Sequence, residues 1–293
     1  MKRNNTLGGI IFDIFNIIFM LFMIVITLYP MYHIVMGSFS EPAKLIAHTG
    51  ALLRPAGFST IGYEAVLGNK DVYTGYANTL FYVIVGTALS FLVTSLLAYA
   101  LSRKNVKYSK YMMIFVIITM FFSGGMIPLY LVVKGCGLLN TRWAPIVPVL
   151  INVYNLIVMK TAFMSIPDSL IEAAKIDGAS EFRVWARIVM PLSMATIAVF
   201  LLFTGVGFWN SWFSALIYIK DRAKFPLQLF LREILVNNST NNMMSDTMAG
   251  EAASIEDVIK YATIVVATIP VLMIYPFMQK YFVNGVMIGA VKG

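Results

Sequence analysis

Charged residues are scarce in this chain. Only 12% of its 293 residues are Asp, Glu, Lys or Arg, whereas 59% are hydrophobic. Soluble domains carry about 25% charged and roughly 45–50% apolar residues. Half the usual charge, with this excess of apolar residues, excludes an ordinary water-soluble domain and predicts an integral membrane protein.

Motifs of several enzyme classes are also missing. No Gly-Lys dipeptide occurs, so the chain lacks a phosphate-binding loop of the G-x-x-x-x-G-K-[ST] type. Its two histidines, His33 and His48, have no carboxylate or thiolate cluster around them, which argues against a metal site. The single cysteine, Cys136, excludes an internal disulfide. We therefore expect no catalytic residue, no metal ligand and no cofactor bound by this chain.

The basic residues do not form a nucleic-acid-binding surface. The net charge is +8, but the lysines and arginines are spread along the chain and form no dense stripe. Such a distribution is typical of residues that flank membrane spans. We expect a lipid bilayer as partner and no nucleic acid.

Six apolar segments are long enough, or nearly so, to cross a bilayer, which takes about 20 helical residues each. A β-barrel would instead show short alternating strands. The segments cover about 11–36, 76–101, 111–133, 143–163, 191–219 and 261–280. No small-residue cleavage site follows the first segment, so it reads as a retained span and not as a signal peptide. The predicted fold is an all-α membrane protein with six transmembrane helices, forming a single domain over residues 1–293.

Loop charges predict the orientation of these spans. The short loop 102–110, SRKNVKYSK, has four basic residues and no acid, whereas the opposing loop 134–142 has only Lys134 and Arg142. Because basic loops tend to stay inside the cell, both termini are predicted to be cytoplasmic. The loop 167–191 is then cytoplasmic as well, and the polar segment 220–260 is an external loop.

The predicted spans offer little for ion coupling. Five of the six contain no Asp, Glu, Lys or Arg across their central portions, although proton- or ion-coupled carriers usually need ionisable groups at depth. If the protein moves a solute uphill, another subunit must supply the energy. A channel or secondary carrier acting alone, and a membrane enzyme or scaffold, remain the alternatives.

The cytoplasmic loop 167–191 reads as two short helices. The first can begin at Pro167 or Asp168, with Asp168 as candidate N-cap, and Gly178 can end it in a left-handed conformation. A second amphipathic turn follows and leads into Pro191. On periodicity alone, the loop could also be a connector that lies on the lipid surface.

This loop resembles the EAA loop of bacterial ABC importer permeases, in which E-A-A is followed by D-G-A and later by I and L-P. The matching residues, with Met190 in place of the usual leucine, are Glu172, Ala173, Ala174, Asp177, Gly178, Ala179, Ile188 and Pro191. Two further features, Trp209-Asn210 and the ending QKYFVNGVMIGAVKG at 279–293, resemble the carbohydrate branch with the maltose-type membrane subunits. The polysaccharide- and lipoprotein-associated subgroup is the most similar part of that branch.

The resemblance implies a type I ABC importer permease fold in the bacterial cell membrane. It implies a second homologous permease subunit, two ATPase subunits that bind ATP and Mg, and an extracellular solute-binding protein. The EAA loop would couple to the ATPases, and the substrate would be a saccharide, most simply an oligosaccharide. A permease for a non-sugar substrate is the alternative within the same family.

Sugar-binding candidates follow from chemistry, since aromatic faces stack on pyranose rings and amides hydrogen-bond to hydroxyls. The candidates in the fourth and fifth spans are Asn152, Tyr154, Asn155, Trp209, Asn210 and Trp212. Tryptophan and tyrosine are also common at membrane interfaces, and buried amides often bridge helices. Both explanations stay open for each residue.

Overall fold

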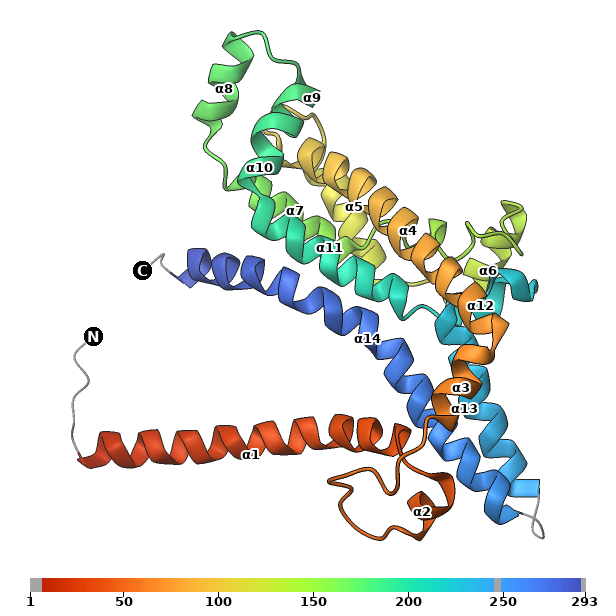
Figure 1. The fold of residues 1–293 in the computed structure, drawn as a ribbon. Helices are drawn as coiled ribbons and strands as arrows, with labels where there is room; N and C mark the ends of the chain where they lie inside the picture. The colour runs from red at the N-terminus through yellow and green to blue at the C-terminus, as the bar shows by residue number, and fades with distance from the viewer. Residues whose placement is uncertain (1–6, 245–248, 291–293) are drawn as a thin grey trace. The chain divides into compact units, whose positions relative to one another are not determined.

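The computed structural model describes residues 7–244 and 249–290 (Figure 1). Within these ranges every regular element is a helix and no strand occurs, which confirms the all-α class. The chain divides into two compact units, one formed by 1–69 and 233–269 and the other by 70–232 and 270–293. The single membrane domain stays a prediction, and each unit is described by itself.

The first unit begins with α1 (Leu7–Ser38), followed by α2 (Pro42–Ala47) and α3 (Ile61–Gly68). None of the residues in the most apolar window of α1 is buried, as expected for a helix whose side chains face lipid. At its C-terminal end α1 meets α14 (Ala249–Ala290), where the rings of His33 and Tyr261 lie 5.9 Å apart.

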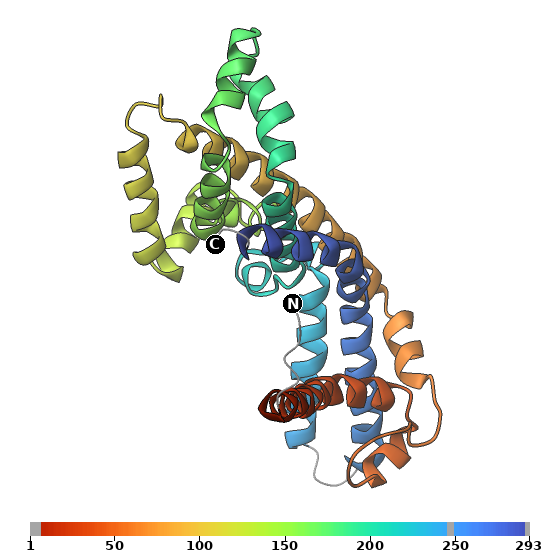
Figure 2. The same cartoon turned by 90° about the vertical axis from the view of Figure 1, so that its left-hand side faces the viewer.

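The centre of the second unit is α4 (Lys70–Ser102). Helices α7 (Val153–Met164) and α11 (Met194–Trp209) lie along it (Figures 1 and 2). The buried side of α4 carries a small residue at every fourth position over much of its length: Gly86, Ser90, Thr94, Ala98 and Ser102. Small residues at this spacing let helix backbones approach closely in a membrane.

Gly86 is closely packed, because an added Cβ would lie 2.7 Å from the Phe208 ring. We expect Gly86→Ala to destabilise the protein by about 1–3 kcal/mol through overpacking. Thermal unfolding in detergent measures the loss. Phe208→Leu, which removes the ring, should restore part of the stability in the double variant. Gly207→Ala, where an added Cβ meets nothing within 4 Å, is the matched control and should not unfold earlier.

Three predicted spans, 11–36, 76–101 and 261–280, lie inside the long helices α1, α4 and α14. The segment 111–133 is not one straight helix. It forms α5 (Ser109–Phe121) and α6 (Met126–Gly135), which meet at 118°. Gly125 at the bend has a φ of +89°, a conformation that glycine adopts without a steric penalty.

The segments 143–163 and 191–219 are also interrupted. Residues 143–152 form turns and the 3₁₀ segment η1 (Val147–Val149), and only α7 continues as an α-helix. Pro145 and Pro148 explain this, because proline lacks an N–H and clashes with the preceding turn. The helix pair ending at Leu192 and beginning at Met194 bends by 86°, and the short α12 (Phe213–Tyr218) follows after a further break.

By length and composition, three helices of the described chain can span a membrane, or five if each bent pair counts as one. The predicted spans 111–133, 143–163 and 191–219 are thus interrupted helices and not single straight ones. Six crossings and cytoplasmic termini stay predictions.

The segment 220–260, predicted to be an external loop, is mostly helical in its described residues, and its external position stays a prediction. Helix α13 (Leu227–Met244) occupies its middle, and polar side chains of α4 hold its start. The Asn78 amide donates to the carbonyl oxygens of Ala223 and Phe225 at 2.8 and 3.0 Å. The Thr79 hydroxyl accepts the Leu227 N–H at 2.8 Å. These bonds satisfy backbone groups that a loop would otherwise leave exposed.

Candidate functional site

The first helix of the EAA loop (residues 167–191) is α8 (Asp168–Ile176). Its N-cap is Pro167, so the N-cap role expected for Asp168 is wrong. The Asp168 carboxylate instead accepts a hydrogen bond from Lys104 Nζ at 2.7 Å. This ammonium holds the pKa of the Asp168 carboxyl below its ordinary value, and Asp168 in turn raises the pKa of Lys104. The contact ties the start of α8 to the loop after α4.

Gly178 ends α8, as predicted. Its φ is +79°, in the left-handed region. The Gly178 N–H donates to the Lys175 carbonyl at 3.0 Å, and the Ala179 N–H donates to the Ala174 carbonyl at 2.9 Å. This pair of bonds is a Schellman motif, which satisfies the last carbonyls of a helix when a glycine follows it. The chain turns back at this point.

The returning arm begins with α9 (Glu181–Val184), continues through the π-helical turn η2 (Trp185–Val189) and ends in α10 (Met190–Leu192). The wider turn arises where Pro191 supplies no N–H for the carbonyl of Arg187, one helical turn earlier. The Met190 N–H bonds to the Trp185 carbonyl, five residues earlier, and not to the Ala186 carbonyl as in an α-helix. π-turns within helices are frequent at functional sites.

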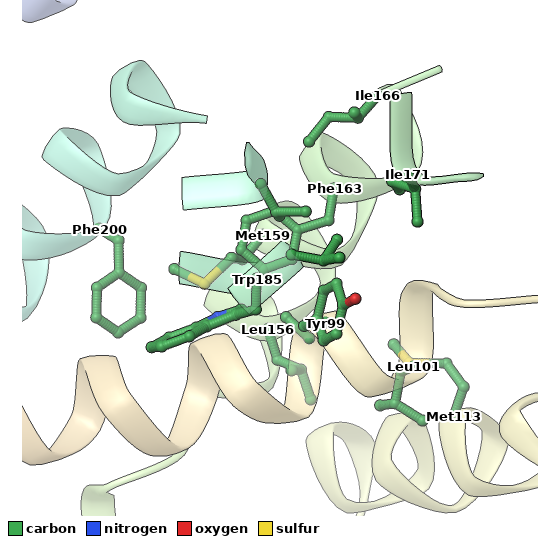
Figure 3. Close-up of a cluster of buried hydrophobic side chains, with 13 residues drawn as sticks. Tyr99, Leu101, Met113, Leu156, Met159, Phe163, Ile166, Ile171, Trp185 and Phe200 are labelled. Carbon is green, nitrogen blue, oxygen red and sulfur yellow. The ribbon is translucent and has the colours of Figure 1, made fainter. Parts of the chain in front are cut away.

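A buried cluster joins both arms of the EAA loop to the rest of the unit. Ile171 from α8 and Trp185 from η2 pack with residues of α4, α5, α7 and α11 (Figure 3). Five other residues of the loop are half-buried and pack against this cluster: Ala174, Ala179, Ala186, Ile188 and Met190. The loop is therefore packed onto the helices through a core and is not a floating connector in this structure.

A polar contact adds to this core. The buried Tyr99 of α4 donates its hydroxyl proton to Glu181 Oε2 at 2.5 Å, and Lys175 Nζ lies 2.5 Å from Glu181 Oε1. Arg103 donates to the Phe163 carbonyl at 3.0 Å and stacks on the Tyr99 ring. One carboxylate thus links α8, α9 and α4. Sequence reasoning missed this link because Tyr99 and Glu181 are 82 residues apart.

We expect Tyr99→Phe to lower the free energy of unfolding by about 1 kcal/mol, a usual value for one hydrogen bond. The effect is modest because the Glu181 side chain is 58% exposed and water can replace the lost donor. Thermal unfolding of the purified protein measures the change. Tyr111→Phe is the control, since that side chain is 69% exposed. Equal stability of the two variants would contradict the role given to Tyr99.

The outer face of α8 has a different composition. Glu172 and Ala173 are exposed, and so are Asp177 and Gly178 at the turn. Within the described chain the Glu172 carboxylate makes no hydrogen bond or ion pair. Ile176 is 86% exposed and Phe182 is 64% exposed. Ile176 falls outside the apolar stripe formed by Ile171 and Ala174, and the sequence pattern did not single it out.

Two of the predicted sugar-binding residues meet in one place. Asn152 and Asn155 at the start of α7 line a hollow of about 280 Å³ against α11 and the start of α12. Asn152 also caps α7, since its side-chain oxygen accepts the Asn155 N–H at 3.0 Å. Its other polar lining residues are Thr204, Ser211 and Ser214, none of which the sequence had indicated. We refer to this hollow as the polar hollow.

The remaining candidates lie outside the polar hollow. Trp209 is buried, with its ring 6.1 Å from that of Tyr76. One face of Trp212 is covered by the Arg232 guanidinium at 4.7 Å. Tyr154 is 63% exposed, and Asn210 is exposed immediately after α11. The structure therefore brings two of the six together, and the role of each residue stays a prediction.

Comparison with known proteins agrees with this architecture. Residues 80–288, which include the EAA loop, match the family model described as "Binding-protein-dependent transport system inner membrane component". Protein LplC of Bacillus subtilis is 44% identical, over 99% of this chain and 98% of its own length. The polygalacturonan/rhamnogalacturonan transport system permease protein YtcP of the same organism is 40% identical, over 97% of this chain and 99% of its own.

A solved structure is similar over nearly the whole chain. It is described as a bacterial ABC transporter involved in the import of the acidic polysaccharide alginate, and it aligns with a TM-score of 0.85 at 30% identity. The alignment covers 94% of this chain and 98% of that one. The family match, the two relatives and this shared fold lead to one conclusion: the chain belongs to the binding-protein-dependent transport system inner membrane components, the permease subunits of ABC importers.

Proposed function

We propose that this protein is one of two permease subunits in an ATP-driven importer of a saccharide, in the bacterial cell membrane. The observation that carries the proposal is the EAA loop, a capped helical turn packed onto the core with an exposed acid and an exposed isoleucine on its outer face. The relatives support a saccharide substrate. YtcP is named as a permease for polygalacturonan and rhamnogalacturonan, and the similar solved structure is described as an importer of alginate.

The proposal includes six crossings, both termini in the cytoplasm and a single membrane domain. The partners are a second homologous permease, two ATPase subunits that bind ATP and Mg, and an extracellular solute-binding protein. Residues 37–75 and 220–260 would then face outward, and the EAA loop would face the ATPases.

The packing of the EAA loop suggests how coupling would work. Because Ile171 and Trp185 belong to the same core as α4 and α7, a displacement of α8 moves these helices with it and not the loop alone. The Tyr99–Glu181–Lys175 contact opposes separation of α8 from α9. Closure of an ATPase dimer on ATP would thereby shift the helices between inward-open and outward-open arrangements.

Reconstitution tests the proposal. The chain is purified with its second permease and ATPase, placed in proteoliposomes and given the binding protein with neutral or uronate oligosaccharides. We expect uptake only with ATP, and a photo-cross-linker at the exposed Ala173 should capture the ATPase. Uptake without ATP, or cross-links to lipid alone, would instead favour a carrier or channel acting by itself.

The polar hollow makes a separate prediction. We expect Asn155→Ala to raise the saccharide concentration needed for half-maximal ATPase stimulation by about tenfold, because the loss of a buried hydrogen bond to a substrate costs about 1–3 kcal/mol. Tyr154→Ala is the matched control, because the Tyr154 side chain is next to Asn155 in the sequence but does not line the hollow. A larger effect at Tyr154 than at Asn155 would move the pathway away from this hollow.

A further inference from the structure

A second hollow lies at the end of α4, separate from the polar hollow. It has a volume of about 520 Å³ and is bordered by the last turn of α4, the loop 103–108, the start of α5 and the end of α7. Four basic residues line it, Arg103, Lys104, Lys110 and Lys160, and no acidic residue does. We refer to it as the basic hollow.

Two of these cations already have partners within the protein. Arg103 donates to the Phe163 carbonyl, and Lys104 pairs with Asp168. Lys110 and Lys160, by contrast, make no hydrogen bond or ion pair with the part of the chain that the structure describes. They come from separate helices, α5 and α7, and Lys160 is half-buried. Cations that share one hollow repel each other, so an anion between them would be stabilising.

Apart from Ser102 and Ser109, the rest of the lining is apolar or aromatic. Met113 and Ile114 of α5 and Met164 of α7 form one side of the basic hollow. Tyr108 and Tyr111 are exposed at its edge, at 63% and 69%, and tyrosine is enriched where a membrane meets water. A free phosphate or a nucleotide would leave the apolar side unfilled. A ligand with an anionic head and hydrocarbon chains matches both sides.

We propose that the basic hollow binds an anionic phospholipid of the inner leaflet, with Lys110 and Lys160 contacting the headgroup phosphate and the apolar side contacting the acyl chains. The proposal rests on the topology given under the proposed function, which places this end of α4 at the cytoplasmic leaflet. Basic pockets between spans on that side are suited to anionic headgroups. Lysines that only set the orientation of the membrane spans could lie anywhere on the cytoplasmic side. Lys110 and Lys160 are 50 positions apart in the sequence, yet they line the same hollow.

Lipid labelling of the full-length chain in nanodiscs tests this. A photoreactive phosphatidylglycerol is added to phosphatidylcholine discs, and labelled peptides are mapped by mass spectrometry. We expect labels on α5 and α7 around the basic hollow. Lys110→Gln/Lys160→Gln should reduce this labelling about tenfold, since each lysine near a headgroup contributes to binding. The control, Lys107→Gln/Lys134→Gln, removes the same charge from residues that do not line the hollow and should label normally.

Each other outcome overturns the proposal. Equal loss in both double variants would show a general effect of charge, and unchanged labelling in both would show that the two lysines are not ligands. Competition by inorganic phosphate as effective as that by unlabelled phosphatidylglycerol would make the hollow a free-anion site. Labels that map elsewhere in the unmodified chain overturn the proposal even if the variants fail to fold. ATP-driven uptake is measured separately, so its loss with labelling intact bears only on the proposed function.

Discussion

Gly178→Val is expected to reduce ATP-driven uptake by at least tenfold while leaving membrane insertion intact. Gly178 has a φ of +79°, and a β-branched residue is strongly disfavoured there. A residue held in such a conformation costs about 1–3 kcal/mol. The upper part of this range applies to a β-branched residue and shifts the turn more than tenfold toward other conformations. The Schellman bonds to Lys175 and Ala174 would weaken, and α8 would no longer present its outer face in one orientation.

Gly178→Val distinguishes two explanations for a loss of uptake, an unfavourable backbone conformation and a steric clash of the new side chain. An added Cβ at Gly178 meets nothing within 4 Å, so a steric clash does not explain a loss of function. Gly178→Asn is the matched control, because asparagine tolerates the left-handed region far better than valine. Uptake in proteoliposomes and ATPase stimulation by the binding protein are the measurements. If asparagine and valine reduce uptake equally, the conformational explanation is wrong.

The EAA loop is the part that the sequence predicted best. A glycine after an amphipathic stretch indicated the helix end, and the structure confirms it at Gly178. The family motif indicated which residues to examine, and the family is confirmed by the comparisons. These features are local in the chain, so periodicity and turn chemistry are sufficient to find them.

Prolines and glycines in the spans permit bends, but the sequence did not show which of them would break a helix. Apolar length alone does not distinguish one straight helix from two that meet at an angle, as α5 and α6 do at 118°. In a membrane, prolines and glycines are tolerated inside spans when neighbouring groups satisfy the freed backbone. From the sequence alone, Pro145 and Pro148 are therefore compatible with either a kinked helix or a broken one.

Long-range contacts could not be predicted from the sequence. The Tyr99–Glu181 bond and the burial of Trp209 depend on which helices pack together, and a single sequence gives no signal for this. The same limit applies to the polar hollow, whose serines and threonine are unremarkable in the chain. Asn152 and Asn155 were found because amide side chains can hydrogen-bond to sugar hydroxyls.

The second large effect is expected at Glu172, one turn after Asp168 on the same helix. Glu172→Lys should abolish ATPase coupling without lowering the unfolding temperature. The Glu172 side chain is exposed, and its carboxylate makes no hydrogen bond or ion pair within the described chain. Its one internal electrostatic effect is a weak attraction to Lys104, which contributes little at an exposed position. Glu172 also lies beside the exposed Ala173 and Ile176. Reversing a charge at an interface costs several kcal/mol when a partner cation is present.

Asp168 provides the matched comparison on α8. Its carboxylate is paired with Lys104, and exposed pairs of this kind contribute little to stability. Asp168→Asn should therefore change coupling by about twofold or less, by the small weight of such pairs, whereas Glu172→Gln should weaken it and Glu172→Lys should remove it. Co-purification of the ATPase and ATPase activity of the assembled complex are measured for all three. Because the two acids share one helix, equal losses at both positions would mean that the variants act through the fold of α8 and not through a docked partner.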